Sequence, residues 1–172
     1  KDWVLVEPDT GKVDGKEGYF MVNGEEVFCV DYFTDFHSGK TVTAGSFKDI
    51  GISEETARKL SLVAYYGSKV EGRTDRDWYA ITQGLLWRII HNRDDLKYVR
   101  TNTAYTYEEV QKCWNEILAD VDRYYVAPSF SDETHSVDSD GALKLNDTKG
   151  VLSDMIVADS GGLDVSIQGN QL

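Results

Sequence analysis

The hydrophobic pattern of this chain changes its period twice, and that change limits the folds that the chain can adopt. Residues 1–45 carry short apolar runs separated by turn residues, a pattern typical of strands. Residues 46–128 carry apolar side chains at the spacing of amphipathic helices, and residues 129–172 return to strand-like runs. We therefore predict an α+β fold in which a β-sandwich or barrel-like sheet holds an inserted three-helix bundle. A chain of 172 residues is long enough for one domain, and we expect residues 1–172 to form one.

The clearest local signal in the first part is the pair Asn23-Gly24, which lies between two runs rich in aromatic and β-branched residues. Both positions of a tight hairpin turn need positive φ, and these two residue types accept it. We predict a hairpin of residues 18–22 and 25–33, in which strand alternation puts Cys29 on the face opposite Phe28. The other strand-like runs are residues 3–6, 150–152, 155–158 and 163–167.

Three helices are predicted in the middle of the chain, and each begins with residue types that cap helix N-termini. The first follows Ser53 and ends at Gly67, and the second follows residues 74–77 and ends near His91. The third follows the capping-box pattern of residues 106–109. Its apolar side chains follow the i, i+3, i+4 rule of a one-sided helix: Val110, Cys113, Trp114, Ile117, Leu118 and Val121.

The second predicted helix places a glutamine among large apolar side chains. On the helical wheel, Gln83 is flanked by Tyr79, Trp87 and Ile90. A buried carboxamide group that lacks a hydrogen-bond partner costs about 1–3 kcal/mol, so Gln83 needs partners for its oxygen and its nitrogen. The helix pattern alone favours the interpretation of a core glutamine bonded to nearby backbone.

The two cysteines, Cys29 and Cys113, are compatible with two states. In a secreted protein a pair of cysteines suggests one disulfide, whereas in a cytosolic protein it suggests two free thiols. The three histidines, His37, His91 and His135, do not stand at metal-ligand spacing with one another or with a cysteine. We therefore expect no metal ion and no other cofactor.

The net charge of −12 argues against a nucleic-acid partner, because a protein that neutralises phosphates needs a stripe of Lys and Arg. It argues equally against docking on anionic lipid. No apolar run approaches the roughly 20 residues that span a bilayer, so we expect no membrane insertion. An acidic surface can instead attract a lysine-rich partner. No signal peptide is visible, which is typical of a mature or excised fragment.

Two short segments carry a family resemblance. The segment 28–30, Phe-Cys-Val, and the segment 81–87, Ile-Thr-Gln-Gly-Leu-Leu-Trp, resemble the two signatures of the thioester domains of Gram-positive bacterial surface adhesins. The second signature of that family is Thr-Gln-x-Ala-x-Trp, and this chain has Leu85 where alanine is usual. The helical segment 57–67 and the order of strands and helices also resemble the family, so the likeness covers most of the chain.

The resemblance implies an intramolecular thioester between the Cys29 sulfur and the Gln83 side-chain carbonyl, formed with loss of ammonia. A lysine amine on a host surface or matrix protein would then take the acyl group as an isopeptide-type amide and free the thiol. That is single-turnover covalent binding by a monomeric, extracellular, cell-wall-anchored protein, and it is not enzymatic turnover. The motif residues expected to accompany or shield the bond are Phe28, Val30, Tyr79, Thr82 and Trp87. The candidates for a base that activates the amine are His37, His91, Asp31 and Tyr79.

Two other functions compete with this one. The first is a non-covalent secreted binding module with a Cys29–Cys113 disulfide. The second is a cysteine hydrolase or transglutaminase-like enzyme with Cys29 as nucleophile, although Asp31 and Asp35 would raise the pKa of that thiol. Residues 131–141 are acidic and could suggest a calcium site, but their pattern departs from an EF-hand loop, and we expect a solvated loop.

Overall fold

A computed structural model describes most of the chain, namely residues 3–6, 12–33, 39, 41, 45–100, 105–130, 137, 139 and 141–172. Its contacts divide the chain into two compact units, Lys1–Val121 and Asp122–Leu172. Each unit is described by itself. His37, His135 and most of the acidic segment 131–141 lie outside the described residues.

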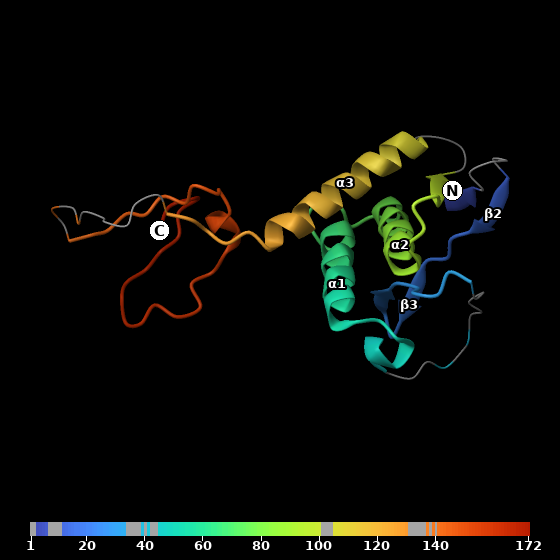
Figure 1. Ribbon diagram of the computed structural model, residues 1–172, viewed down its shortest axis with the longest axis horizontal. Coiled ribbons are helices and arrows are strands. Elements are labelled where there is room, and N and C mark those ends of the chain that lie inside the picture. Colours follow the sequence, from blue (N-terminus) through green and yellow to red (C-terminus); the bar gives the residue numbers. More distant parts are fainter. Residues whose placement is uncertain are drawn as a thin grey trace. The chain divides into compact units, whose positions relative to one another are not determined.

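The three predicted helices are present in the order expected (Figure 1). They are α1 (Glu54–Ser68), α2 (Arg76–His91) and α3 (Tyr107–Tyr124), and a 3-10 helix, η1 (Phe47–Ile50), precedes α1. The cap of α1 is as predicted, because the Ser53 hydroxyl accepts a hydrogen bond from the Thr56 backbone N–H at 3.1 Å. In α2 the capping residue is Asp75, whose carboxylate accepts from two backbone N–H groups of the first turn.

The α3 N-terminus forms the predicted reciprocal cap. The Glu109 carboxylate accepts from the Thr106 backbone N–H at 2.6 Å, and the Thr106 hydroxyl accepts from the Glu109 N–H at 3.3 Å. Farther along α3 the apolar face is buried, and Trp114 donates its indole N–H to the Ile81 carbonyl oxygen of α2 at 2.7 Å. These contacts join α3 to the core of the first unit.

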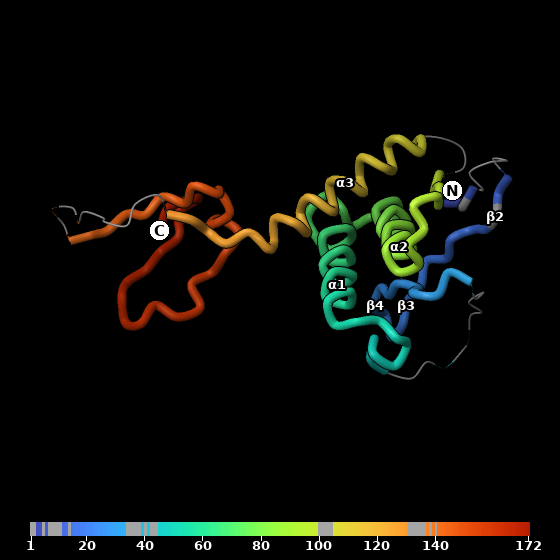
Figure 2. Tube along the Cα trace, viewed as in Figure 1, coloured from blue at the N-terminus to red at the C-terminus, as the bar shows by residue number. Residues whose placement is uncertain are grey.

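The first unit also contains two small antiparallel sheets. One has the strand order β2-β1-β5, formed by β2 (Val13–Lys16), β1 (Trp3–Val6) and β5 (Lys97–Arg100). The other is the predicted hairpin of β3 (Phe20–Val22) and β4 (Glu25–Val27), seen side by side in Figure 2. Its turn residues, Asn23 and Gly24, have φ values of 53° and 86°. The α+β class is confirmed, but these strands do not close into a barrel within the described part of the chain.

The strand predicted over residues 25–33 is too long, because β4 ends at Val27. Beyond that residue the backbone takes its partners from α2 instead of from another strand. The Cys29 N–H and carbonyl bond to the Gln83 side chain, and the Tyr32 N–H bonds to His91. The physical reason for the error is therefore a change of hydrogen-bond partner that the strand-like composition does not reveal.

Helix α2 forms the centre of the core, since every residue from Tyr79 to Trp87 is buried. It packs side by side with α1 at a point of very close approach, where Gly67 lies directly against the side chain of Thr82. A second glycine, Gly84, lets Tyr98 and Trp114 approach: a β-carbon there would lie 3.2 Å from each. Small residues thus let the neighbouring elements reach the backbone of α2.

The second unit is organised around one buried carboxylate. Asp147 accepts hydrogen bonds from the backbone N–H groups of Ser129, Lys149, Val151 and Leu152, at 2.7–3.0 Å. These four bonds outweigh the effect of burial, which raises the pKa of Asp147, and hold that pKa at about 2. A side chain therefore supplies here the acceptors that a neighbouring strand would otherwise provide.

The strands predicted at 150–152, 155–158 and 163–167 are wrong. Residues Leu152–Asp154 form a 3-10 turn, η2, because two of the N–H groups at its start bond to Asp147. Gly161 and Gly162 have φ values of 61° and 88° and interrupt the chain between the other two runs. The described residues of the second unit pair only through isolated bridges, such as Asn146 with Gln171.

Candidate functional site

The carboxamide of Gln83 is bonded to the backbone of Cys29, although 54 positions separate the two residues. The Cys29 N–H donates to Gln83 Oε1 at 2.7 Å, and Gln83 Nε2 donates to the Cys29 carbonyl oxygen at 2.7 Å. Gln83 has 0 % of its surface exposed. The two bonds give the Gln83 oxygen and nitrogen the partners that a buried carboxamide needs. They also hold the carboxamide against Cys29, which carries the thiol.

A stripe of four side chains on α2 explains this position. Tyr79, Gln83, Trp87 and His91 follow one another at four-residue spacing, which puts them on one face of the helix. Each contacts the segment 27–33: the Tyr79 hydroxyl donates to the Val27 carbonyl at 2.8 Å, and the His91 ring lies at the other end. We call these four residues the α2 stripe.

Aromatic rings flank the Cys29–Gln83 contact on both sides. Phe28 stacks on Tyr79 with ring centroids 4.8 Å apart and an interplanar angle of 13°. Tyr32 meets Trp87 edge to face, with centroids 5.3 Å apart. The predicted shielding residues Phe28, Tyr79 and Trp87 are thus brought together around the pair. Tyr32 was not predicted, although an aromatic residue three positions after the cysteine was a usable signal.

Two predicted motif residues lie elsewhere or act differently. Thr82 donates its hydroxyl to the Trp78 carbonyl of its own helix at 2.7 Å and faces Gly67 of α1, so it serves helix packing. Val30 contributes its backbone, because its carbonyl oxygen lies 3.2 Å from Nε2 of His91. Leu85, at the position where alanine is usual, is 3 % exposed and lies between the helices.

The thiol of Cys29 is partly buried, and it donates to the backbone carbonyl oxygen of Asp31 at 3.1 Å. Burial raises the pKa of Cys29, while the neighbouring Asp31 backbone and the nearby Trp87 side chain lower it by less. Cys29 is therefore a protonated thiol near neutral pH. Cys113 is also a free thiol, so the structure contains no Cys29–Cys113 disulfide.

The described candidates for a base are all engaged with backbone beside Cys29. Tyr79 is a hydrogen-bond donor, and burial raises its pKa well above the ordinary value, so it stays neutral. Nε2 of His91 lies 3.2 Å from the Val30 carbonyl oxygen and 3.3 Å from the Tyr32 nitrogen. The Asp31 carboxylate accepts from the Phe33 N–H at 2.9 Å. His37 lies outside the described residues.

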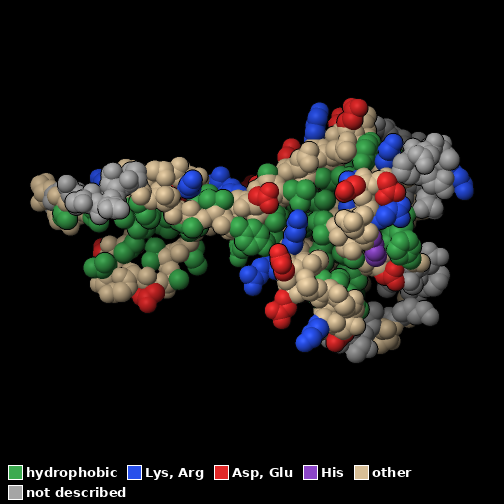
Figure 3. Space-filling view, in the orientation of Figure 1, with side chains coloured by type: hydrophobic (Ala, Val, Ile, Leu, Met, Phe, Trp, Pro, Cys, Tyr) green, Lys and Arg blue, Asp and Glu red, His purple; other side chains and the backbone are tan. Residues whose placement is uncertain are grey.

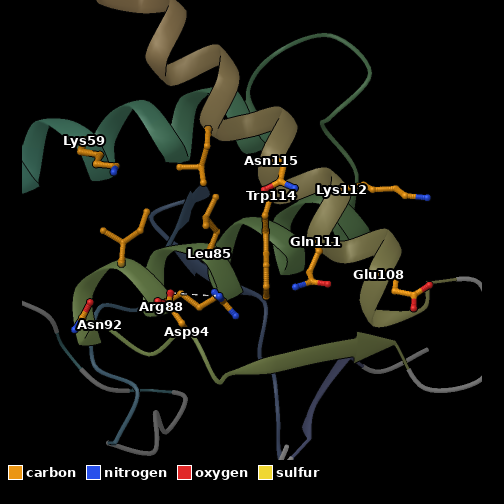
Figure 4. Close-up of a pocket in the computed structure, with 12 residues that line it drawn as sticks. Lys59, Leu85, Arg88, Asn92, Asp94, Glu108, Gln111, Lys112, Trp114 and Asn115 are labelled. Carbon is orange, nitrogen blue, oxygen red and sulfur yellow. Dashed lines mark hydrogen bonds and ion pairs between the residues drawn. The ribbon is translucent and has the colours of Figure 1, made fainter.

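A groove in the first unit is lined by other residues than this pair. It has a volume of about 730 Å³ and is lined by residues of α1, α2 and α3 (Figure 4). Arg88 lies in it, stacked on the Trp114 ring at 4.7 Å and bonded to the Leu96 carbonyl at 2.9 Å. Neither Cys29 nor Gln83 lines the groove, so the chemistry suggested by the pair does not depend on it.

The side chains of the described residues bear on whether the chain could hold a metal or a nucleic acid. Within the described ranges, no three His, Cys, Asp or Glu side chains converge as metal ligands. On the face seen in Figure 3, Lys and Arg side chains are interspersed with Asp and Glu. None of the described helices combines the length and the apolar character that a membrane crossing requires.

One family model matches the chain, and one solved structure is similar to it in fold. The family model for the thioester domain matches residues 26–123, which include both Cys29 and Gln83. The solved thioester domain of the Staphylococcus aureus TIE protein is similar in fold, with a TM-score of 0.72 and 20 % sequence identity. That similarity covers 99 % of this chain and 70 % of the TIE chain. A comparison with curated proteins found no match. The family model covers more than half of the chain, and the chain therefore belongs to the thioester domain family.

Proposed function

We propose that residues 1–172 act as one thioester domain of a covalent adhesin, in which Cys29 and Gln83 form an internal thioester that captures a lysine amine. Membership of the family supports a covalent adhesin module. The observation that carries the residue assignment is the double hydrogen bond between the Gln83 carboxamide and the Cys29 backbone. It keeps one partly buried thiol and one buried carboxamide together beside two pairs of aromatic rings.

Formation of the bond needs proximity above all, because a carboxamide is a poor electrophile and the thiol is protonated. The Cys29 sulfur attacks the Gln83 side-chain carbon, the C–S bond forms, the C–N bond breaks, and the thiol proton leaves with ammonia. Well-oriented groups within one molecule react as if present at roughly 10⁵–10⁸ M. The Cys29 N–H, 2.7 Å from Oε1, is placed to stabilise the negative charge that develops on that oxygen.

Capture of an amine runs this acyl exchange in the opposite direction. A lysine amine attacks the thioester carbonyl, the C–N bond forms, the C–S bond breaks, and one amine proton passes to the Cys29 sulfur. The stacked pair of Phe28 and Tyr79 and the contact of Tyr32 with Trp87 keep water from the bond until a nucleophile enters. Each molecule would react once, which distinguishes this chemistry from that of a cysteine hydrolase.

The setting that fits this chemistry is outside the cell. A thioester domain of a surface protein acts extracellularly, and we propose a cell-wall-anchored, monomeric adhesin of a Gram-positive bacterium whose partner is a host surface or matrix protein. The net charge of −12 favours an approaching lysine-rich surface.

The test is the intact mass of the untreated protein. We expect a mass below the sequence mass by one ammonia, and the same deficit in the Cys113→Ala variant, which keeps both reacting groups. The deficit should disappear in Cys29→Ala and in Gln83→Ala. An untreated protein of full sequence mass would overturn the proposal.

A further inference from the structure

One polar atom beside the proposed thioester has no hydrogen-bond partner. Nε1 of Trp87 is buried, the whole side chain is 7 % exposed, and no acceptor of good geometry reaches this N–H in the described structure. The other two buried tryptophans of this core do bond their indole N–H groups, Trp114 to the Ile81 carbonyl oxygen at 2.7 Å and Trp3 to the Asp77 carboxylate at 3.0 Å. A buried donor without a partner costs about 1–3 kcal/mol, so the position of Trp87 calls for a partner that appears in another state of the site.

The Cys29 sulfur is the atom that can become this partner. Trp87 follows Gln83 by one helical turn on the α2 stripe, and its ring is held by Tyr32, three residues after Cys29. In the thiol state the sulfur is turned toward the Asp31 carbonyl oxygen, to which it donates at 3.1 Å. The Trp87 side chain nevertheless lies near enough to act as a donor to that sulfur and favour its ionised form.

We propose that the Trp87 indole N–H donates a hydrogen bond to the Cys29 sulfur whenever that sulfur carries negative charge, and so assists opening of the thioester. This inference rests on the proposed function. During amine attack the electron pair of the breaking C–S bond passes to sulfur, which then takes the amine proton to become a thiol. A thiolate is a much better acceptor than a thioester sulfur, so the bond to Trp87 strengthens as the leaving group departs.

The environment of Cys29 makes such a donor necessary. Burial raises the pKa of the thiol, which makes the thiolate a poor leaving group. The Asp31 carboxylate adds to this effect, and the Asp31 backbone, which lowers the pKa, offsets burial only in part. Tyr79 donates its proton to the Val27 carbonyl and is occupied. Among the side chains described around the sulfur, Trp87 is thus the one with an unused N–H.

The first experiment measures the Cys29 thiol directly, without a thioester. In the double variant Cys113→Ala/Gln83→Ala, Cys29 is the remaining thiol, and its pKa is obtained from the pH dependence of its alkylation by iodoacetamide. Adding Trp87→Phe should raise this pKa by about one unit, roughly a tenfold loss of thiolate near neutral pH. Adding Trp78→Phe, the same change on the same helix at a ring that stacks under Arg73, should leave it unchanged. An equal pKa in both variants would overturn the inference.

The second experiment needs no substitution at Trp87 and so covers the case in which Trp87→Phe does not fold. In the same double variant, the indole N–H resonance of Trp87 should shift with pH along the ionisation curve of Cys29, while that of Trp78 should not. A Trp87 resonance that ignores the ionisation would contradict the proposed hydrogen bond.

The third experiment links the bond to the reaction. In single variants that keep Gln83, Trp87→Phe should still lose one ammonia but should react with methylamine roughly tenfold more slowly than Trp78→Phe. Equal rates of thioester opening in Trp87→Phe and Trp78→Phe would show that Trp87 does not assist the reaction. If the unmodified protein instead had the full sequence mass, the proposed thioester would be ruled out. The pKa comparison would still decide whether Trp87 bonds to the sulfur.

Discussion

Gly67 of α1 and Thr82 of α2 lie so close that a β-carbon on Gly67 would overlap the threonine side chain. Thr82 cannot turn away freely, because its hydroxyl donates to the Trp78 carbonyl at 2.7 Å. This contact fixes the distance between α1 and α2, and α2 carries Gln83 on the face that meets Cys29.

We predict that Gly67→Ala destabilises the protein by about 1–3 kcal/mol, the usual cost of inserting atoms into a packed core. Urea denaturation measures the effect. The control is Gly15→Ala, where a β-carbon meets nothing within 4 Å. The double variant Gly67→Ala/Thr82→Ala should recover part of the loss. Equal stability of the two single variants would show that the helices can separate without cost.

The stability of the second unit should depend on the ionised form of Asp147. Its folded pKa of about 2 lies below the ordinary value, because backbone N–H groups outweigh the effect of burial. The contribution is therefore complete above the ordinary pKa near 4 and is lost as the pH falls toward 2. The protection factors of the Val151 and Leu152 amides against hydrogen exchange should fall over that range. They should already be low above the ordinary pKa in Asp147→Asn but not in Asp164→Asn, which changes an exposed carboxylate.

Glu17 should produce the opposite pH dependence in the first unit. Burial raises its pKa from 4.5 to about 8, and the nearby Tyr98 side chain opposes this only in part. The folded state therefore keeps a proton that the unfolded chain releases. The free energy of unfolding should fall as the pH rises from about 4.5 to 8, by at most about 1.4 kcal/mol per pH unit.

Glu17→Gln should flatten this slope, because a carboxamide does not titrate. The measurement is denaturant unfolding at several pH values. The matched control is Glu25→Gln, at an exposed position of β4. A slope that survives Glu17→Gln would assign the pH dependence to another group.

The site of the captured amine should be Gln83. After incubation with methylamine, peptide mapping should find an N-methylated carboxamide at Gln83 and a free thiol at Cys29, because amine attack occurs at carbonyl carbon. An adduct that remained on the sulfur would instead favour the hydrolase-like alternative.

Loss of the cross-link should abolish capture without unfolding the protein. The bond would close a loop of 54 positions, which corresponds to roughly 4 kcal/mol of stabilisation as an upper bound, against a typical total of about 5–15 kcal/mol. We expect Cys29→Ala to have a lower melting temperature, a native circular dichroism spectrum and no amine capture. An unfolded variant would show that the bond is chiefly a structural staple, and a folded variant that still captured amines would place the chemistry elsewhere.

The helices and their caps could be predicted because each depends on residues adjacent in sequence. Thr106 and Glu109 cap α3 by local bonds, and Asn23 with Gly24 forms its turn without help from the rest of the chain. The pairing of Cys29 with Gln83 was expected only from a family resemblance, since spacing alone gives no reason to bring together two residues 54 positions apart.

The predictions that were wrong concern backbone groups whose partners are side chains. A strand was expected to continue past Val27, but the side chains of Gln83 and His91 take the place of a neighbouring strand. Strands were also expected near residue 150, where the Asp147 carboxylate collects the N–H groups. In both cases the composition suits a strand, and hydrophobic periodicity does not reveal the competing acceptor. Gln83 and His91 lie far along the chain, and the Asp147 carboxylate is polar.

The α2 stripe limits where residues can be inserted into this chain. Four helical residues advance about 6 Å along the axis and two extended residues about 6.6 Å, so two contacts four residues apart on α2 match two residues of an extended segment. Tyr79 meets Val27 and Gln83 meets Cys29 at this common step. One residue inserted between Val27 and Cys29 would turn the thiol to the other side of the chain and move it half a step along the helix. The number of residues between Val27 and Cys29 is therefore tied to the number between Tyr79 and Gln83.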